Sequence, residues 1–457
     1  MVTVSYKYVL KEEDMRLELT NFAKIKNASI EIDGITIIAG NNNTGKSTIG
    51  KALFCMFNSL YDIAEQVDDQ RRKRLYAVCT VSLRNTILRY SFDKYRSTVR
   101  TRQLSQKICR ALVLDLEEKD ASNLTREIFK DCVKEALSDN GIELQEDAID
   151  EYVETVYPGV IETKEMKDEH IAHQLIYRFF SNVFDGQIQN LEYNGKTEIQ
   201  LQIKNKKVSI AFENNECIDW NPKIDILHNA FFIDDPFILD ELKFNTDFNI
   251  EYMSNSNMMR SFLLRRIIGQ FKQEEQIIET VLAKEKLKEV YKLLREIAPG
   301  NISTDLSDGT WALESAYYNE PIMFGNLSAG LKAFVLLRLL LEKSILKDKD
   351  VLVLDEPEIH LHPEWQIKYA EIIVMLQKAF DLSIVVTTHS QEFLEAIELF
   401  SKKHRIQEKC NYYLAVQNEG ISEFKCVTND ITEIYRQLVT PSMYLDRIRF
   451  ELEDENE

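Results

Sequence analysis

Residues 35–50 read ITIIAGNNNTGKSTIG and join a short apolar stretch, a glycine-rich loop and the start of a helical pattern. Residues 35–39 are mostly β-branched and have the length of a buried strand. Residues 40–47 fit the phosphate-loop pattern G-x-x-x-x-G-K-S. Backbone N–H groups and the positive end of a helix favour an anion at such a loop. The stretch therefore predicts a nucleoside-triphosphate site, with Lys46 on the β- and γ-phosphates and Ser47 on Mg²⁺.

Composition places the chain among globular proteins of two or three domains. It has 457 residues, of which 44% are hydrophobic and 29% charged. No run approaches the roughly 20 apolar residues of a membrane helix, and the first ten residues lack a signal-peptide layout. The seven cysteines are scattered without a C-x-x-C pair. We expect a cytoplasmic protein with no membrane contact, no disulfide and no cysteine-based zinc site.

Charge is unevenly distributed along the chain. The whole sequence carries a net charge of −19, whereas residues 71–110 contain twelve basic residues and one acid, Asp93. Such asymmetry is typical of a surface that binds a polyanion, either DNA or an acidic protein. The alternative is that this segment pairs with acidic side chains of the chain itself. The sequence supports both interpretations equally.

The overall pattern predicts an α/β fold with a mixed sheet, interrupted by a largely helical insertion with a small β meander. We expect strands at 15–22, 28–33, 35–39 and 229–233, and helices at 46–64, 102–116 and 274–297. Residues 120–185 also have a helical pattern, with interruptions at 139–141 and 157–159. Two β-type runs are expected at 75–83 and 86–92, a meander at 189–213 turning at Asn194-Gly195, and a hairpin at 411–426. The expected divisions are 1–64 with the phosphate loop, 65–228 as the insertion, 229–300 as a core strand with helices, and 301–457 as the rest of the nucleotide-binding part.

Three later stretches supply candidate partners for the phosphate loop. An apolar strand at 351–354 ends in Asp355, which can hold the Mg²⁺ water shell, and Glu356, which can act as general base for water. A β-branched strand at 383–388 ends in His389, and residues 326–332 place a serine and a glycine at a helix start. Alone, these features read as a solvated acidic turn, a surface histidine and an ordinary helix cap. Their order beside a phosphate loop favours function.

Taken together, the four motifs resemble those of ATP-binding-cassette (ABC) ATPases. The stretch EPEIHLHPEWQ at 356–366 and the opening around the phosphate loop resemble the soluble SMC-, RecF- and OLD-like branch of that class. Many bacterial anti-phage ATPases belong to this branch, including the AriA subunit of PARIS and the PtuA subunit of Septu. The resemblance covers roughly residues 15–60 and 320–400. It implies an ABC-type ATPase head with ATP and Mg²⁺ as its ligands.

The resemblance also implies roles for individual residues. The serine–glycine motif would bind the γ-phosphate of an opposing subunit, so that a head-to-head dimer or larger homo-oligomer shares two ATP sites. No glutamine loop stands out, and Gln187, Gln189, Gln200 and Gln202 all remain candidates. The implied sites are Asn42, Asn43, Gly45, Lys46, Ser47 and Thr48 in the phosphate loop; Ser47 and Asp355 on the metal; Glu356 and His389 in catalysis; and Ser328, Gly330 and Lys332 in the signature.

Two functions fit these expectations best. One is an ATPase that converts ATP and water to ADP and phosphate and acts as sensor or regulator of a separate effector in anti-phage defence. This sequence shows no nuclease motif, so any nuclease activity would belong to that separate effector. The basic segment at 71–110 would contact DNA or an acidic DNA mimic. The alternative is a RecF-like repair ATPase regulated by DNA itself. A transporter subunit is disfavoured by the large insertion and by the extended acidic motif.

Overall fold

A computed structural model describes most of the chain, and its contacts divide into two units. One unit comprises Met1–Tyr61 and Ile176–Glu457, and the other Asp62–Leu175. The described residues are 15–90, 98–190, 192, 195–214, 216–220, 226–242, 258–269, 285–304, 309–315, 317–418 and 420–454.

The two units differ in secondary structure. The strands are β1 (Met15–Phe22), β2 (Ile25–Glu31), β3 (Ile35–Gly40), β4 (Thr197–Ile203), β5 (Lys206–Glu213), β6 (Glu216–Trp220), β7 (Ala230–Ile233), β8 (Asn301–Thr304), β9 (Trp311–Glu314), β10 (Ile322–Met323), β11 (Val351–Asp355), β12 (Ser383–Thr388), β13 (Cys410–Asn418) and β14 (Ile421–Cys426). The α-helices are α1 (Lys46–Leu60), α2 (Ile63–Tyr90), α3 (Thr98–Glu117), α4 (Arg126–Ser138), α5 (Glu146–Glu165), α6 (Asp168–Val183), α7 (Met258–Gly269), α9 (Lys288–Ile297), α10 (Ala329–Glu342), α11 (Pro363–Phe380), α12 (Gln391–Lys403) and α13 (Thr432–Asp454).

Eleven of the described strands form one mixed sheet in the order β6-β5-β4-β1-β2-β14-β13-β3-β12-β11-β7. The five strands from β13 to β7 run parallel, whereas β1, β4, β5 and β6 pair antiparallel. Strands β8, β9 and β10 form a separate antiparallel sheet. The predicted α/β class with a mixed sheet is confirmed.

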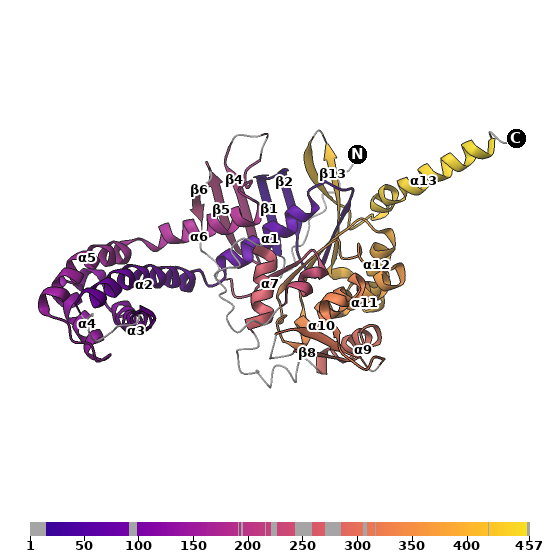
Figure 1. Ribbon diagram of the computed structural model, residues 1–457. Helices are drawn as coiled ribbons and strands as arrows, with labels where there is room; N and C mark the ends of the chain where they lie inside the picture. Colours follow the sequence, from indigo (N-terminus) through magenta and orange to yellow (C-terminus); the bar gives the residue numbers. More distant parts are fainter. Residues whose placement is uncertain are drawn as a thin grey trace. The chain divides into compact units, whose positions relative to one another are not determined.

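The parallel strands are buried on both faces, which explains their continuous apolar sequence. All six residues of β3 are buried. Ile35 and Ile37 pack in the core that contains α10, α11 and α12, whereas Ile38 packs in the core that contains α1 (Figure 1). Because β3, β11 and β12 are parallel, their carboxyl ends meet at one edge of the sheet. The phosphate loop, the acidic turn and the histidine of the sequence motifs all follow these ends.

The second unit is helical and corrects one prediction. Residues 75–83 and 86–92 were expected as strands, but residues 63–90 form the single helix α2 (Figure 1). Leu75, Cys79, Leu83 and Ile87 are at most 1% exposed and pack against α3, α4 and α5. Their spacing of four residues forms one helical face, which outweighs the β-branched composition. Helix α3 confirms the helical prediction at 102–116.

The β meander joins the main sheet, although it was expected within the insertion at 65–228. Strand β4 pairs with β1, with Leu201 opposite Leu17, and β5 continues the antiparallel order. Alternate residues of β4 and β5 are buried in the same core as α1, which holds the meander to the first unit. The expected turn residue Asn194 and much of the 274–297 helix lie outside the described residues. The hairpin at 411–426 is confirmed as β13 and β14.

No helix among the described residues has the length and hydropathy needed to cross a membrane.

Candidate nucleotide-binding and catalytic site

The phosphate loop joins β3 to α1 and requires two glycines. A Cβ atom on Gly40 would lie 2.3 Å from the Ala415 carbonyl oxygen, so a side chain cannot fit there. Gly45 is the N-cap of α1 in the left-handed conformation, with φ of 80°. No side chain caps α1. The Thr48 N–H donates to the Gly45 carbonyl oxygen at 3.1 Å, whereas among the described residues no partner is found for the N–H groups of Lys46 and Ser47, which can receive an anionic ligand.

Lys46 is buried inside this loop. Its side chain is 3% exposed, and the ammonium donates to the carbonyl oxygens of Gly40 (2.9 Å) and Asn41 (2.8 Å). The same nitrogen lies 3.4 Å from Glu356 Oε1. The ammonium thus has three oxygen neighbours. Phosphate oxygens of a bound nucleotide can replace these neighbours.

A cavity of about 280 Å³ lies over the loop, and its lining includes every phosphate-loop residue that the sequence predicted. Two lining residues were not among the predicted site residues: Thr44, within the loop itself, and Lys24, in the turn between β1 and β2. The Lys24 ammonium donates to Asn43 Oδ1 at 2.5 Å and adds a second positive charge. A single lysine in a turn has no distinguishing sequence pattern. The lining residues are Lys24, Asn42, Asn43, Thr44, Gly45, Lys46, Ser47, Thr48 and Glu356.

The acidic pair at the end of β11 is fixed by β12. Asp355 lies opposite Thr387 in the parallel register, and the Thr387 hydroxyl donates to Asp355 Oδ1 at 2.6 Å. The Glu356 N–H donates to the Thr387 hydroxyl (3.0 Å) and to its carbonyl oxygen (3.1 Å). Glu356 has a left-handed φ of 50°, which is unfavourable for a residue other than glycine. The two hydrogen bonds to Thr387 hold the backbone in this conformation. The Glu356 carboxylate consequently faces Lys46.

His389 follows β12 at the same edge. Its Nδ1 lies 3.6 Å from Glu356 Oε2, and the side chain is 43% exposed. The next residue, Ser390, caps α12 by accepting from the Phe393 N–H at 3.2 Å. The structure therefore brings Lys46 together with Glu356 and His389, which lie more than 300 positions later in the sequence.

The signature residues on α10 lie apart from this cavity. Ser328 is exposed and caps α10, accepting from the Leu331 N–H at 3.4 Å. Gly330 is buried, and a Cβ atom there would lie 3.0 Å from the Trp365 ring and 3.1 Å from the His360 carbonyl oxygen. The glycine thus allows α10 to approach the loop that follows β11.

Lys332, the third residue of the predicted signature, is buried among residues of its own chain. Its side chain is 2% exposed, and its ammonium lies 2.6 Å from Asp240 Oδ1 and 4.5 Å from the centre of the Phe237 ring. It also donates to the Gly325 carbonyl oxygen at 3.3 Å. All of these contacts of Lys332 are within the chain.

The strand beside β11 carries a further carboxylate that sequence reasoning did not identify. Ile233 pairs with Leu354, so Asp234 follows β7 just as Asp355 follows the last paired residue of β11. Arg260 Nε lies 3.7 Å from Asp234 Oδ1. Burial raises the pKa of the Asp234 carboxyl, Arg260 opposes this, and Asp355 raises it further.

The candidate glutamines lie far from this edge in the sheet order. Gln200 and Gln202 belong to β4, which is separated from β3 by β1, β2, β14 and β13. Gln187 and Gln189 precede β4 in the chain, and Gln189 pairs with Phe22 of β1. Asp234 is therefore nearer to the phosphate loop in sheet order than either β4 glutamine.

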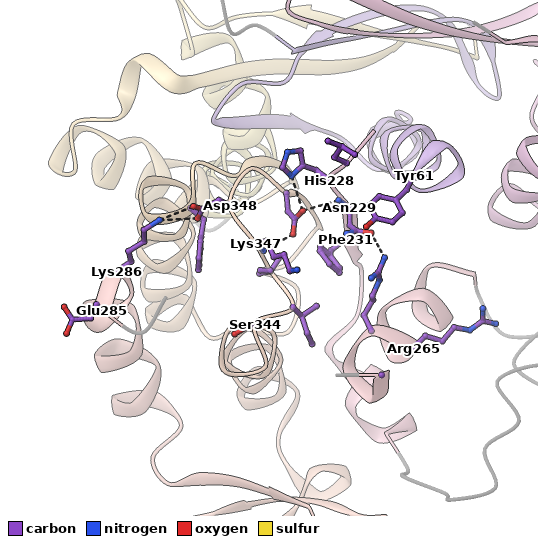
Figure 2. Close-up of a pocket in the computed structure, with 17 residues that line it drawn as sticks. Tyr61, His228, Asn229, Phe231, Arg265, Glu285, Lys286, Ser344, Lys347 and Asp348 are labelled. Carbon is purple, nitrogen blue, oxygen red and sulfur yellow. Dashed lines mark hydrogen bonds and ion pairs between the residues drawn. The ribbon is translucent and has the colours of Figure 1, made fainter. Parts of the chain in front are cut away.

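A larger cavity, of about 860 Å³, lies where β7 and β11 begin, at the opposite edge of these strands (Figure 2). Asp350 is buried there and accepts from the backbone N–H groups of Lys347 (2.8 Å) and Asn229 (3.1 Å). Burial raises the pKa of this carboxyl to about 6. Arg266 donates to Asn229 Oδ1 at 2.6 Å. These contacts join the starts of the two strands, and the cavity is not part of the phosphate site.

The basic segment at 71–110 is partly neutralised within its own unit. Arg71 pairs with Asp168, Arg72 with Glu117, Lys73 with Asp69, and Arg89 with Glu151. Within the part of the chain that the structure describes, four other exposed side chains of the segment have no ion-pair partner, namely Arg74, Arg102, Lys107 and Arg110. Pairing with acidic side chains of the same chain thus accounts for four of the basic residues. The four unpaired side chains leave a smaller basic surface.

A buried parallel strand, a glycine-rich loop with an inward lysine, and an acid on a neighbouring strand define a P-loop nucleotide-binding protein. Residues 15–394 match the family described as "AAA ATPase domain". The match covers most of the sequence, so the chain belongs to this family of ATPases. A search among curated proteins gave no match.

Solved structures of SMC heads show distant similarity. They include an SMC head bound to the C-winged helix domain of ScpA, with 11% identity, a TM-score of 0.41 and coverage of 92% of this chain and 99% of that chain. The SMC head domain from Thermotoga maritima has 12% identity, a TM-score of 0.35 and coverage of 91% and 99%. An SMC head with an extended coiled coil and the C-terminal domain of ScpA, from Pyrococcus furiosus, has 12% identity, a TM-score of 0.38 and coverage of 96% and 99%. Similarity at this level carries no functional argument.

Proposed function

We propose that the chain is an ABC-type ATPase that hydrolyses ATP to ADP and phosphate at sites shared between two copies. The observation that carries this proposal is the meeting of Lys46, Glu356 and His389 at one edge of the sheet. Glu356 lies 3.4 Å from the lysine ammonium through one carboxylate oxygen and 3.6 Å from the histidine ring through the other. A carboxylate so placed is a suitable general base for a water molecule beside a bound phosphate.

The residues present also fit a magnesium ion. Ser47 follows Lys46 at the start of α1, and the Asp355 carboxylate is oriented by Thr387. No group of three or more His, Cys, Asp or Glu side chains suited to a metal occurs among the described residues. This agrees with Mg²⁺ sites that combine one or two protein ligands with nucleotide oxygens and water. Mg²⁺ would supply charge neutralisation on the phosphate oxygens.

Nucleotide binding would rearrange the contacts of Lys46. Its ammonium would exchange the Gly40 and Asn41 carbonyl oxygens for phosphate oxygens, and its ion pair with Glu356 would weaken. Glu356 then takes the proton of the attacking water, while His389 stays beside it. Lys24 and the N–H groups of Lys46 and Ser47 at the start of α1 would hold the remaining phosphate charge.

A shared site is supported by the position of Ser328. The residue is exposed at the N-terminus of α10 and is not among the residues that line the phosphate cavity of its own chain. An exposed helix N-terminus with a serine cap can contact a phosphate group. In a head-to-head dimer, Ser328 of each copy would complete the site of the other copy.

For the biological role, we propose a sensor or regulator of a separate nuclease effector in anti-phage defence. The support is the resemblance of residues 356–366 to soluble defence ATPases. The exposed Arg74, Arg102, Lys107 and Arg110 are the proposed contact for DNA or an acidic protein. In a RecF-like repair ATPase, DNA itself would be the regulator.

ATP turnover and phage plating test this proposal. Lys46→Ala is expected to abolish hydrolysis in the purified protein, and unchanged turnover would refute the phosphate-loop assignment. Cells that express the chain with its neighbouring gene should lower phage plating, and Lys46→Ala should restore it. Equal plating with and without the chain would refute the defence role.

DNA titrations at several salt concentrations separate defence from repair. A repair ATPase should bind DNA with a log–log salt slope near −0.9 per phosphate contact, and DNA should stimulate its turnover. Replacing Arg102 and Lys107 by glutamate should then weaken binding, whereas Arg89→Glu, in which the original arginine is paired with Glu151, serves as the control. Absence of DNA binding by the wild-type protein would exclude the repair alternative.

A further inference from the structure

Glu358 is a buried acid beside the proposed catalytic residues, and the mechanism above does not use it. It lies in the loop between β11 and α11 and is 3% exposed. Its Oε1 accepts from the Thr388 hydroxyl at 2.5 Å and from the His389 N–H at 3.0 Å. One carboxylate oxygen therefore holds the end of β12 and the backbone of His389.

The same oxygen also faces the histidine ring. His389 Nδ1 lies 3.7 Å from Glu358 Oε1 and 3.6 Å from Glu356 Oε2, so this nitrogen has a carboxylate on two sides. A carboxylate beside one ring nitrogen favours a hydrogen on that nitrogen and limits rotation of the ring. The two acids thus select the Nδ1–H form of His389, and Nε2 remains for another partner.

A purely structural role does not need a charge at this position. The two bonds that Glu358 accepts could be accepted equally well by the carbonyl oxygen of a glutamine. Its second oxygen, Oε2, is buried and has no hydrogen-bond partner among the described residues. Burial of a carboxylate is unfavourable unless it is paired, and burial here raises the pKa of Glu358. Because burial makes the charged form of Glu358 unfavourable, a carboxylate at this position is better explained by a function that uses its charge.

We propose that Glu358 is a positioning residue that holds the His389 ring against Glu356 during ATP hydrolysis. The proposal rests on the ATPase function proposed above and adds a residue to it. Glu358 acts through His389 and does not itself contact the nucleotide cavity, whose lining residues do not include it. Because it sits in the loop after Glu356, it also ties the position of the ring to that of the proposed general base.

Glu358→Gln tests this role because glutamine keeps an acceptor for both donors and removes the charge. We expect kcat to fall about tenfold, as is common when a partner that orients a functional histidine is removed. KM for ATP and the melting temperature should remain at the wild-type values. The matched control is Glu371→Gln, which removes a carboxylate 3.7 Å from another histidine, His404, outside the phosphate cavity. This control should keep the wild-type kcat.

The combination with His389→Ala gives the sharper result. If Glu358 acts through the ring, Glu358→Gln should lower kcat in the wild-type background and have no further effect in the His389→Ala background. Equal factors in the two backgrounds, a normal kcat in Glu358→Gln, or a parallel loss of stability and ATP binding would each overturn the proposal. If Glu358→Gln does not fold, Thr388→Val removes one donor to the carboxylate and should show the same dependence on His389.

The ATPase function and the positioning role of Glu358 can be refuted separately. Wild-type protein without turnover that depends on Lys46 would refute the ATPase function and the role of Glu358 together. Normal turnover in Glu358→Gln, with Lys46→Ala inactive, would refute the role of Glu358 alone.

Discussion

Replacement of Glu356 by glutamine should separate ATP binding from ATP hydrolysis. The substitution removes the ion pair in which Glu356 Oε1 lies 3.4 Å from the Lys46 ammonium. At an effective dielectric constant of about 20, that attraction is worth about 5 kcal/mol before desolvation is counted. ATP must displace it to engage the lysine, so its removal favours binding. Because the Glu356 side chain is 22% exposed and partly solvated, we expect a net gain of only about 1 kcal/mol, or roughly fivefold in affinity.

Hydrolysis should change in the opposite direction. Loss of the general base is expected to slow the chemical step by ~10²–10⁴. Single-turnover measurements of phosphate release give the rate, and titration with a fluorescent ATP analogue in the presence of Mg²⁺ gives the affinity. Glu364→Gln, which alters an exposed glutamate in the first turn of α11, is the control and should leave both unchanged. Normal hydrolysis in Glu356→Gln, or weaker nucleotide binding, would refute this reasoning.

Three further substitutions test the surroundings of the site. Arg338→Met should lower the free energy of unfolding by about 3–5 kcal/mol in urea denaturation, because the buried guanidinium donates to the carbonyl oxygens of Ala298 (2.9 Å) and Gly300 (2.7 Å). Lys332→Met should lower the free energy of unfolding by no more than about 1 kcal/mol, because Asp240 is 38% exposed and can be solvated. ATP turnover distinguishes its roles: normal turnover is expected if Lys332 only pairs with Asp240, and loss of turnover would support the signature role. The Asp350 carboxyl has a folded-state pKa of about 6, above its ordinary value of 3.8, so its stabilising contribution is complete below pH 4 and lost as the pH rises through 6. The difference in free energy of unfolding between Asp350→Asn and wild type should therefore shift by about 2–3 kcal/mol in favour of the variant between pH 4 and pH 7. A difference that does not change with pH would contradict the raised pKa of Asp350.

The nucleotide half of the molecule was predictable because its motifs coincide with continuous buried strands. In each of β3, β11 and β12 an apolar run forms a buried strand, and the predicted site residue follows the end of that strand. The local pattern and the motif thus predict the same structure. Parallel strands place such residues at one edge whatever their separation in sequence. The structure accordingly brings Glu356 and His389 together, as the order of the motifs indicated.

Other features depend on tertiary contacts that the sequence pattern does not show. The sequence of helix α2 predicts two strands because residues such as Val78, Val81 and Ile87 favour β structure. The four-residue spacing of Leu75 and Cys79, whose side chains are buried, is the competing helical signal. The burial of Lys332 depends on Asp240, which lies 92 positions earlier in the chain.

Glu358 and Asp234 were missed for a similar reason. In sequence they are single acids among many in a chain that carries 75. Glu358 becomes informative only when β12 places Thr388 and His389 against it, and Asp234 only when β7 pairs with β11. The positions of these two acids beside the phosphate site are therefore visible only once the sheet order is known.

In the proposed function one ATP site needs residues of two copies, and turnover in a mixture of two inactive variants measures this dependence. Lys46→Ala removes the phosphate-loop lysine and leaves Ser328 intact, whereas Ser328→Arg blocks the exposed helix N-terminus and leaves the phosphate loop intact. Each variant alone should be inactive. In an equimolar mixture of independent sites, half of the dimers are mixed and each has one intact site, so about a quarter of wild-type turnover should return. A mixture that stays inactive after the subunits exchange, or a Ser328→Arg protein that is active alone, would contradict a site shared between two copies.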